Sequence, residues 1–132
     1  MATLKNPQLA ITTRPAHDAA TVVGSVDVSF TTFEVNTMNK LGLRYRLQCD
    51  LLDMDVLYPD TVIRFEQVSL PRTPGEATTL EHVEFVTDAK MSDLHMYVFG
   101  KDPLYARFVL TNEETGAEVI DHSEVVRVDL AA

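Results

Sequence analysis

The stretch Leu41–Leu52, LGLRYRLQCDLL, carries the clearest side-chain pattern of the chain. Apolar residues occupy every second position from Leu41 onward, and Gly, Arg, Gln and Asp residues fill the positions between them. Such alternation gives an extended segment one apolar and one polar face, so it predicts a half-buried β-strand. A helix is the alternative, because several leucines also fall at helical spacing, but it would leave Tyr45 and Cys49 off the apolar stripe. We therefore expect a strand and, with it, a two-layer β protein.

The single cysteine of the chain, Cys49, lies on the apolar side of this expected strand. One cysteine cannot form an internal disulfide, and free cysteines are most often buried as small hydrophobic side chains. A catalytic thiol would need a polar pocket that stabilises its thiolate, which neighbours such as Leu47 and Leu51 do not offer. We expect Cys49 to have a structural role in the core.

Length and charge limit the classes of function that fit. The 132 residues suit one domain, which at this size can form a core without disulfides or metal. Eleven Lys and Arg residues against 20 Asp and Glu give a formal net charge of −9, which argues against binding nucleic acid or anionic membranes. No apolar run has the length of a membrane span or of a signal-peptide core, so a cytoplasmic protein is the default expectation.

The expected domain organisation is an N-terminal segment over 1–20 followed by a β-sandwich domain over 21–132. The first segment holds Pro7 and Pro15 and little periodicity, which predicts an extended arm or an early edge strand. Apolar and alternating runs predict the strands of the domain at 21–30, 41–52, 61–70, 78–87, 94–99, 104–111, 117–120 and 124–128.

A change of parity interrupts the first of these runs. Phe33 and Val35 fall on the opposite parity to the valines before them. This slip predicts a β-bulge near Thr31 and Thr32, or a strand that changes partners at a sheet corner, with a turn over 36–40 after it.

The regular spacing of the expected strands, without a long amphipathic helix or a repeat, is typical of a single antiparallel β-sandwich of seven to nine strands. The segment Tyr105–Val128, YARFVLTNEETGAEVIDHSEVVRV, resembles the last hairpin of immunoglobulin-like and fibronectin-type-III-like domains, with a Tyr near the start and a Gly-containing turn. This resemblance implies an immunoglobulin-like architecture. It implies no activity, because the Trp and the paired cysteines of true immunoglobulin domains are absent.

An acidic loop follows the strand expected at 41–52. Four aspartates lie within Asp50–Asp60, and carboxylate oxygens are the ligands that Ca²⁺ prefers. The stretch LQCDLLDMDVLYPDTVIRF resembles the first calcium-binding loop of C2 domains, and by that resemblance Asp53, Asp55 and Asp60 would be calcium ligands. The second loop of such domains would fall at FGKDP, which offers only Asp102 in place of an Asp-x-Asp pair. The alternative is a solvated acidic loop with no cofactor.

Catalytic and zinc-binding motifs are absent from the sequence. His82 and Glu84 share a strand face, and His95 on the next strand could complete a zinc site, but these spacings match no ligand motif. Residues 121–123, DHS, are adjacent on a strand and point apart, so they cannot form a triad. No P-loop, GxSxG, GxGxxG or CxxC motif occurs, and we expect no enzyme.

Arginines are the remaining candidates for binding. Arg44 and Arg46 share the polar face of the strand at 41–52, and other expected strands carry Arg64, Arg107 and Arg127. If these strands are neighbours, the arginines form a basic stripe able to bind a carboxylate or an acidic partner. The alternative is that they protect an exposed sheet face from aggregation.

Exposed aromatic and apolar residues complete the list of candidates. Tyr58 and Tyr97 could stack on a sugar, which makes a carbohydrate-binding module a further alternative. Residues 94–99 and 125–128 are apolar on both faces, and Leu52, Leu57 and Tyr58 add to this surplus, which favours a homodimer. The sequence thus predicts a non-catalytic binding or assembly module that makes protein–protein contacts, with a calcium-dependent C2-like domain as the main alternative.

Overall fold

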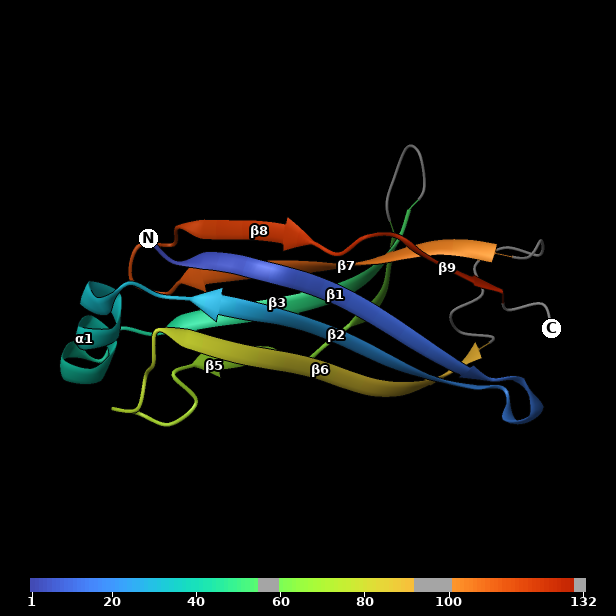
Figure 1. Cartoon of the computed structure of the whole chain (residues 1–132), viewed down its shortest axis with the longest axis horizontal. Coiled ribbons are helices and arrows are strands. Elements are labelled where there is room, and N and C mark those ends of the chain that lie inside the picture. The colour runs from blue at the N-terminus through green and yellow to red at the C-terminus, as the bar shows by residue number, and fades with distance from the viewer. Residues whose placement is uncertain (55–59, 92–100, 130–132) are drawn as a thin grey trace.

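The structure, a computed structural model, describes residues 1–54, 60–91 and 101–129. Within these ranges the chain forms nine strands, one α-helix and one short 3-10 helix (Figure 1). In chain order they are β1 (Thr3–Arg14), η1 (Pro15–His17), β2 (Ala19–Ser29), α1 (Thr32–Leu41), β3 (Tyr45–Asp53), β4 (Asp60–Arg64), β5 (Val68–Leu70), β6 (Leu80–Lys90), β7 (Lys101–Asn112), β8 (Glu118–His122) and β9 (Val126–Asp129). The all-β class expected from the sequence is confirmed.

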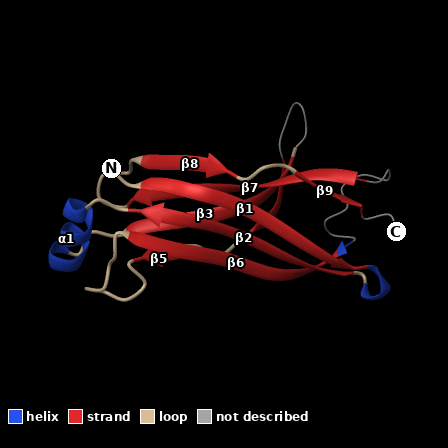
Figure 2. Ribbon diagram, in the orientation of Figure 1, coloured by secondary structure: helices blue, strands red, loops and turns tan. Residues whose placement is uncertain are grey.

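The described strands form two antiparallel sheets. The first has the order β1-β2-β6, and the second has the order β4-β3-β7-β8, with β5 paired to β3 and β9 paired to β7. Figure 1 shows the first sheet in front of the second, and Figure 2 shows α1 at one end of both. The core lies between the two sheets, where Phe85 of β6 and Phe108 of β7 contact each other with ring centroids 6.2 Å apart.

Strand β2 shows how the sequence pattern builds the first sheet. Its burial alternates at every residue, and Val22, Val26 and Val28 are fully buried against the second sheet. Gly24 has the same parity and faces Cys49, Phe108 and Ala106 of the second sheet. A Cβ atom added to Gly24 would lie 3.0 Å from Cys49 Sγ, so this position has room for little more than a hydrogen.

The strand predicted at 41–52 is present but begins at Tyr45. Tyr45, Leu47, Cys49 and Leu51 are all buried, on the side that the alternation assigns to the core. Cys49 has no exposed surface, and burial raises the pKa of its thiol to about 12, so it is neutral at physiological pH. The structural role predicted for Cys49 is confirmed by this burial.

The bulge predicted near Thr31 and Thr32 is wrong, because this segment is the helix α1. The Thr31 hydroxyl accepts a hydrogen bond from the Glu34 N–H (3.1 Å), and the Glu34 carboxylate accepts one from the Thr31 N–H (2.9 Å). This reciprocal capping box starts the helix. Gly42, at φ 76°, ends it in the left-handed conformation. Residues 36–40, expected as a turn, are therefore helical, and Leu41 is the last helical residue.

Two other segments differ from the expected boundaries. The segment over 1–20 contains β1, an edge strand that pairs with β2 and is interrupted by a register shift between Lys5 and Gln8, where Asn6 has φ 52°. The strand expected at 61–70 is divided into β4 and β5. The Gln48 amide fills the gap by donating to the Phe65 carbonyl oxygen at 3.0 Å. The strand expected at 94–99 lies outside the described residues.

Candidate functional site

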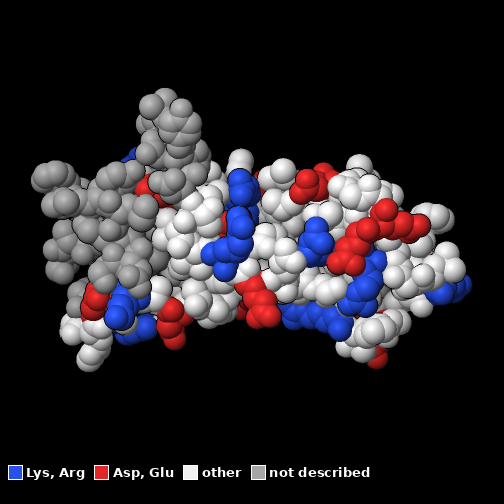
Figure 3. All heavy atoms as spheres, turned by 180° about the vertical axis from the view of Figure 1, so that it is seen from behind, with Lys and Arg blue, Asp and Glu red and all other residues white. Residues whose placement is uncertain are grey.

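The outer face of the second sheet carries four arginines on neighbouring strands. Because Leu47, Cys49 and Leu51 point into the core, the residues between them point outward. Strand register then places the outward side chains together: Asp50 pairs with Arg64 on one side and with Arg107 on the other. We call the surface formed by Arg46, Arg64, Arg107 and Arg127 the arginine face. Figure 3 views the molecule from this side and shows a short band of Lys and Arg side chains across its middle.

Asp50 is the centre of this face. Its carboxylate accepts hydrogen bonds from Arg64 Nε (3.2 Å to Oδ1) and Nη2 (3.4 Å to Oδ2) and from Arg107 Nη2 (3.2 Å to Oδ2). The Gln48 amide nitrogen donates a further bond to Oδ1 at 3.0 Å. The Asp50 side chain is only 3% exposed, whereas those of Arg64 and Arg107 are 66% and 38% exposed. The carboxylate is thus buried beneath two guanidinium groups that reach solvent.

This arrangement leaves the cluster with a net positive charge. One carboxylate balances one of the two guanidinium charges, in a chain whose overall formal charge is −9. Each guanidinium carries five N–H donors, and Asp50 uses at most two of those on either arginine. The remaining donors of the more exposed Arg64 are oriented by the bonds to Asp50, which reduces the entropy lost when a ligand binds. The cluster can therefore hold a second carboxylate.

The other arginines extend this site along the strands. Arg46 lies four residues before Asp50 on β3, which corresponds to about 13 Å. Arg127 of β9 pairs with Pro103 of β7, four residues from Arg107 and thus about 13 Å away in the opposite direction. The predicted basic stripe required these arginines to lie on neighbouring strands, and β4, β3, β7 and β9 are neighbours in the second sheet.

Arg44 does not join this stripe. It donates hydrogen bonds from Nε to the Ser69 hydroxyl (3.0 Å) and from Nη2 to the Pro71 carbonyl oxygen (3.1 Å). These bonds attach β5 and the residue after it to the residue that precedes β3. Arg44, predicted as a binding residue, is thus engaged within its own chain, and Arg46 is the more available of the two.

Most of the predicted calcium and sugar sites lie outside the described residues. This applies to Asp55, Tyr58 and Tyr97. Asp53 is fully buried at the end of β3, where it pairs with Asp60 at the start of β4. Within residues 1–54, 60–91 and 101–129, no cluster of three or more His, Cys, Asp or Glu side chains is arranged to hold a metal ion. Calcium and carbohydrate binding stay predictions of the sequence.

The expected zinc pair, His82 and Glu84, belongs to a hydrogen-bonded surface cluster. His82 Nδ1 lies 2.6 Å from Asp27 Oδ1, and Nε2 lies 3.2 Å from Glu84 Oε1. The hydrogen bond to Asp27, followed by that to Glu84, raises the pKa of His82 above 6.5. Hydrogen bonds from Asn6 and His82 lower the pKa of Asp27 below 3.8. Both ring nitrogens of His82 thus face carboxylates, while His95 lies outside the described residues.

The apolar surplus that predicted a homodimer is partly accounted for within the chain. Leu52 is 2% exposed, so it belongs to the folded interior, whereas Val125 is 36% exposed. Residues 94–99 and Leu57 lie outside the described residues. The prediction of a homodimer therefore depends on other surfaces.

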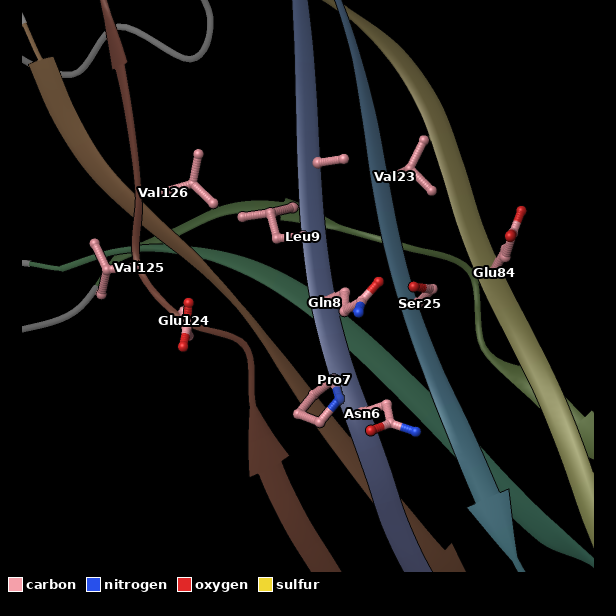
Figure 4. A pocket seen from close by; sticks show the side chains of 11 residues that line it. Asn6, Pro7, Gln8, Leu9, Val23, Ser25, Glu84, Glu124, Val125 and Val126 are labelled. Atoms are coloured by element: carbon pink, nitrogen blue, oxygen red, sulfur yellow. The ribbon is translucent and has the colours of Figure 1, made fainter.

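A groove that the sequence did not predict lies beside β1 (Figure 4). It has a volume of about 660 Å³ and is lined by β1, by residues of β2 and β6 on one side and by the residues at the start of β9 on the other. Leu9 points toward Val125 and Val126 on one side, and Gln8 points toward Ser25 on the other. The groove depends on the bulge in β1 and on the packing of β9, and neither leaves a signal in local sequence.

Comparisons with known proteins identify no family. No protein-family model matches the chain, and no curated protein sequence matches it. A solved structure, the sporulation control protein Spo0M from Bacillus subtilis, matches with a TM-score of 0.42 and 15% identity, over 97% of this chain and 48% of that chain. This chain thus spans about half the length of Spo0M, and we base no argument on the likeness.

Among the described residues, no helix is long and apolar enough to cross a membrane.

Proposed function

We propose that this chain is a non-catalytic binding module that holds an acidic segment of a partner protein on the arginine face. The observation that carries the proposal is the pair of exposed guanidinium groups fixed on the buried carboxylate of Asp50. Arginine binds carboxylates through two parallel N–H donors, and this geometry is strongest when the guanidinium is already oriented.

The spacing of the arginines favours an extended acidic segment. Arg46 and Arg127 lie about 13 Å on either side of the central cluster, measured along the strands. An extended peptide advances roughly 3.3 Å per residue, so about four residues separate one point of contact from the next. A segment with acidic residues about four positions apart would therefore reach Arg46, the Asp50 cluster and Arg127 in turn.

The net charge of the chain favours selective rather than general binding of acidic partners. A chain with a net charge of −9 repels most acidic molecules at long range. A local basic stripe would then select those partners whose carboxylates match its spacing. The scaffold in this proposal is an immunoglobulin-like sandwich, which the two face-to-face antiparallel sheets support at the level of architecture.

The test is a binding titration with a fluorescein-labelled peptide that carries glutamates at every fourth position, measured by anisotropy. We expect Arg46→Glu and Arg127→Glu each to weaken binding, because neither residue is needed to neutralise Asp50. The matched control is Arg14→Glu, which reverses a charge on the first sheet. We expect the affinity for the peptide to fall as salt is added, because salt screens the attraction between exposed charges.

Two outcomes would contradict the proposal. One is an affinity that Arg46→Glu and Arg127→Glu leave equal to that of the control. The other is equal binding of a peptide with lysines in place of the glutamates.

A further inference from the structure

We propose that the free edge of β6 pairs antiparallel with β6 of a second copy of this chain, so that the first sheets of two copies become one continuous sheet. Strand β6 pairs with β2 along one side, and among the described residues no strand pairs with its other side. In Figure 1 this edge runs along the lower margin of the molecule. The surface belongs to the first sheet, so the inference goes beyond the function proposed for the second.

The backbone of β6 directs alternate residues toward the free edge. Two hydrogen bonds to the segments flanking β2 bracket the strand: the Phe30 N–H donates to Thr79 O at 2.8 Å, and the Met91 N–H donates to Asp18 O at 3.0 Å. In an antiparallel pair, the backbone N–H and C=O groups of alternate residues bond to the paired strand, and those of the residues between them point away from it. The odd-numbered residues of β6 therefore bond to β2. The even-numbered residues turn their N–H and C=O groups outward: Leu80, His82, Glu84, Val86, Asp88 and Lys90.

The two edges of the first sheet differ in how far they are protected. Native sheets commonly blunt an edge with a proline, a bulge or a covering segment. The β1 edge has Pro7 and a register shift beside it, and it lies next to β8 and β9. Strand β6 has no proline, and its pairing with β2 is regular from Leu80 to Lys90. The free side of β6 therefore offers a regular row of backbone donors and acceptors, in which the Leu80 and Asp88 carbonyl oxygens also accept bonds from the Thr78 (2.9 Å) and Thr87 (3.3 Å) hydroxyls.

Exposed apolar side chains accompany this row. Leu80 is 59% exposed and Val86 is 58% exposed, and both lie on the outer face of β6. They are large hydrophobic residues at a position where solvent, rather than the core, is their neighbour. Pairing with another strand would cover both of them.

A two-fold axis at Val83 gives a register in which the exposed side chains of the two copies match each other. Backbone parity requires even-numbered residues to face even-numbered residues of the second copy. With the axis at Val83, Leu80 lies opposite Val86 of the other copy, and His82 lies opposite Glu84. The symmetry produces each pair twice. Apolar pairs stabilise antiparallel strands, and a protonated histidine opposite a carboxylate does the same.

The other registers of similar length lack this match. An axis at Glu84 or at Val86 brings like charges opposite each other, Glu84 with itself or Glu84 with Asp88. An axis at Phe85 pairs His82 with Asp88 but sets Val86 against Glu84 and Leu80 against Lys90. An axis at residue 87 pairs Glu84 with Lys90 but sets Val86 against Asp88. Like-charged pairs are destabilising, and a charged residue does not cover an apolar one. Only the register centred on Val83 sets the two exposed apolar residues of β6 against each other, and this match favours a second copy of the chain as the partner.

The oligomeric state of the full chain tests this inference. Sedimentation velocity over a range of protein concentrations should show a monomer that converts to a dimer as concentration rises. Val86→Lys should shift the protein to monomer, because lysine on an edge strand opposes pairing. Ile120→Lys is the matched control, since Ile120 is also 58% exposed but lies on the other sheet. A monomer at every concentration, or a dimer that Val86→Lys leaves unchanged, overturns the inference.

Disulfide cross-linking tests the register and does not depend on the stability of the lysine variant. Paired residues in such a register have Cα atoms about 5.5 Å apart, within the range of a disulfide. We expect Leu80→Cys mixed with Val86→Cys to form a cross-linked dimer under mild oxidation, and neither variant to do so alone. The native Cys49 is fully buried and does not compete. Equal cross-linking of either variant alone, or no cross-link in the mixture, overturns the assignment.

Discussion

Substitution of Gly24 by alanine places one methyl group between the two sheets, next to Cys49 of β3. The new Cβ would lie 3.0 Å from Cys49 Sγ, 3.6 Å from Phe108 Cζ and 3.8 Å from Ala106 Cβ. Favourable contacts between non-bonded heavy atoms lie at about 3.5–4.0 Å, so only the first distance is too short. Cys49 would have to move by about half an ångström, in a strand whose buried neighbours leave it little space.

The expected cost follows from two opposing effects. Overpacking a close-packed core costs about 1–3 kcal/mol. Alanine in a strand interior is favoured over glycine by about 0.5–1 kcal/mol, because it loses less backbone entropy on folding. We therefore expect Gly24→Ala to lower the free energy of unfolding by about 1 kcal/mol.

Urea unfolding of a double-mutant cycle identifies the cause of this loss. Cys49→Ala alone removes a fully buried sulfur atom and should cost about 1 kcal/mol. In that background the methyl group of Gly24→Ala occupies the space that the sulfur left, so the same substitution should stabilise the protein by about 0.5 kcal/mol. Effects that add to within about 0.3–0.5 kcal/mol would refute the reasoning, because independent sites add in this way.

Three further predictions concern the core and two titrating groups. Leu47→Ala removes a fully buried side chain from β3 and should cost about 3 kcal/mol in urea unfolding; a loss below about 1 kcal/mol would contradict its place in the core. Although burial raises the pKa of Glu34, the hydrogen bonds that it accepts outweigh this effect and hold the pKa below 4.5. The stabilisation by its carboxylate is therefore present above pH 4.5 and lost as the pH falls through the folded pKa, and Glu34→Gln should flatten the acid limb of a stability–pH curve. The raised pKa of His82 has the opposite sign: its contribution is complete below pH 6.5 and is lost as the pH rises through the folded value. An NMR titration should place the His82 pKa above 6.5 and show that Asp27→Asn lowers it; an unchanged value in Asp27→Asn would argue against the hydrogen bond.

The strands that were predicted most closely are those with one face in the core. In β2 and β3, alternation follows directly from the pleat, so local sequence reports which side chains are buried. The helix α1 was missed because only Met38 within it is buried, which leaves no clear helical periodicity. Its signals were the cap residues, Thr31 with Glu34 at the start and Gly42 at the end, and these were outweighed by the β-branched residues around them.

The residue types of the arginine face could be predicted from the sequence, but the arrangement of these residues could not. Alternation showed that Arg46 points away from the core, and the other arginines were recognised as possible neighbours. The sequence predicts Asp50 on the polar face of its strand and counts it with the acidic loop that follows, but only strand register shows that it lies between Arg64 and Arg107. Pairing between β3 and β7 joins segments more than fifty residues apart, and no local pattern determines which residues of such strands lie opposite each other.

The central place of β3 in its sheet also determines when the protein can fold during synthesis. Its partner β7 ends at Asn112, so most of the chain must leave the ribosome before β3 has neighbours on both sides. Until then β3 exposes one side of its backbone, beside a leucine-rich face. Non-local strand pairing of this kind folds slowly and leaves aggregation-prone intermediates exposed. We therefore expect the yield of folded protein to fall as the time between the synthesis of β3 and that of β7 becomes longer.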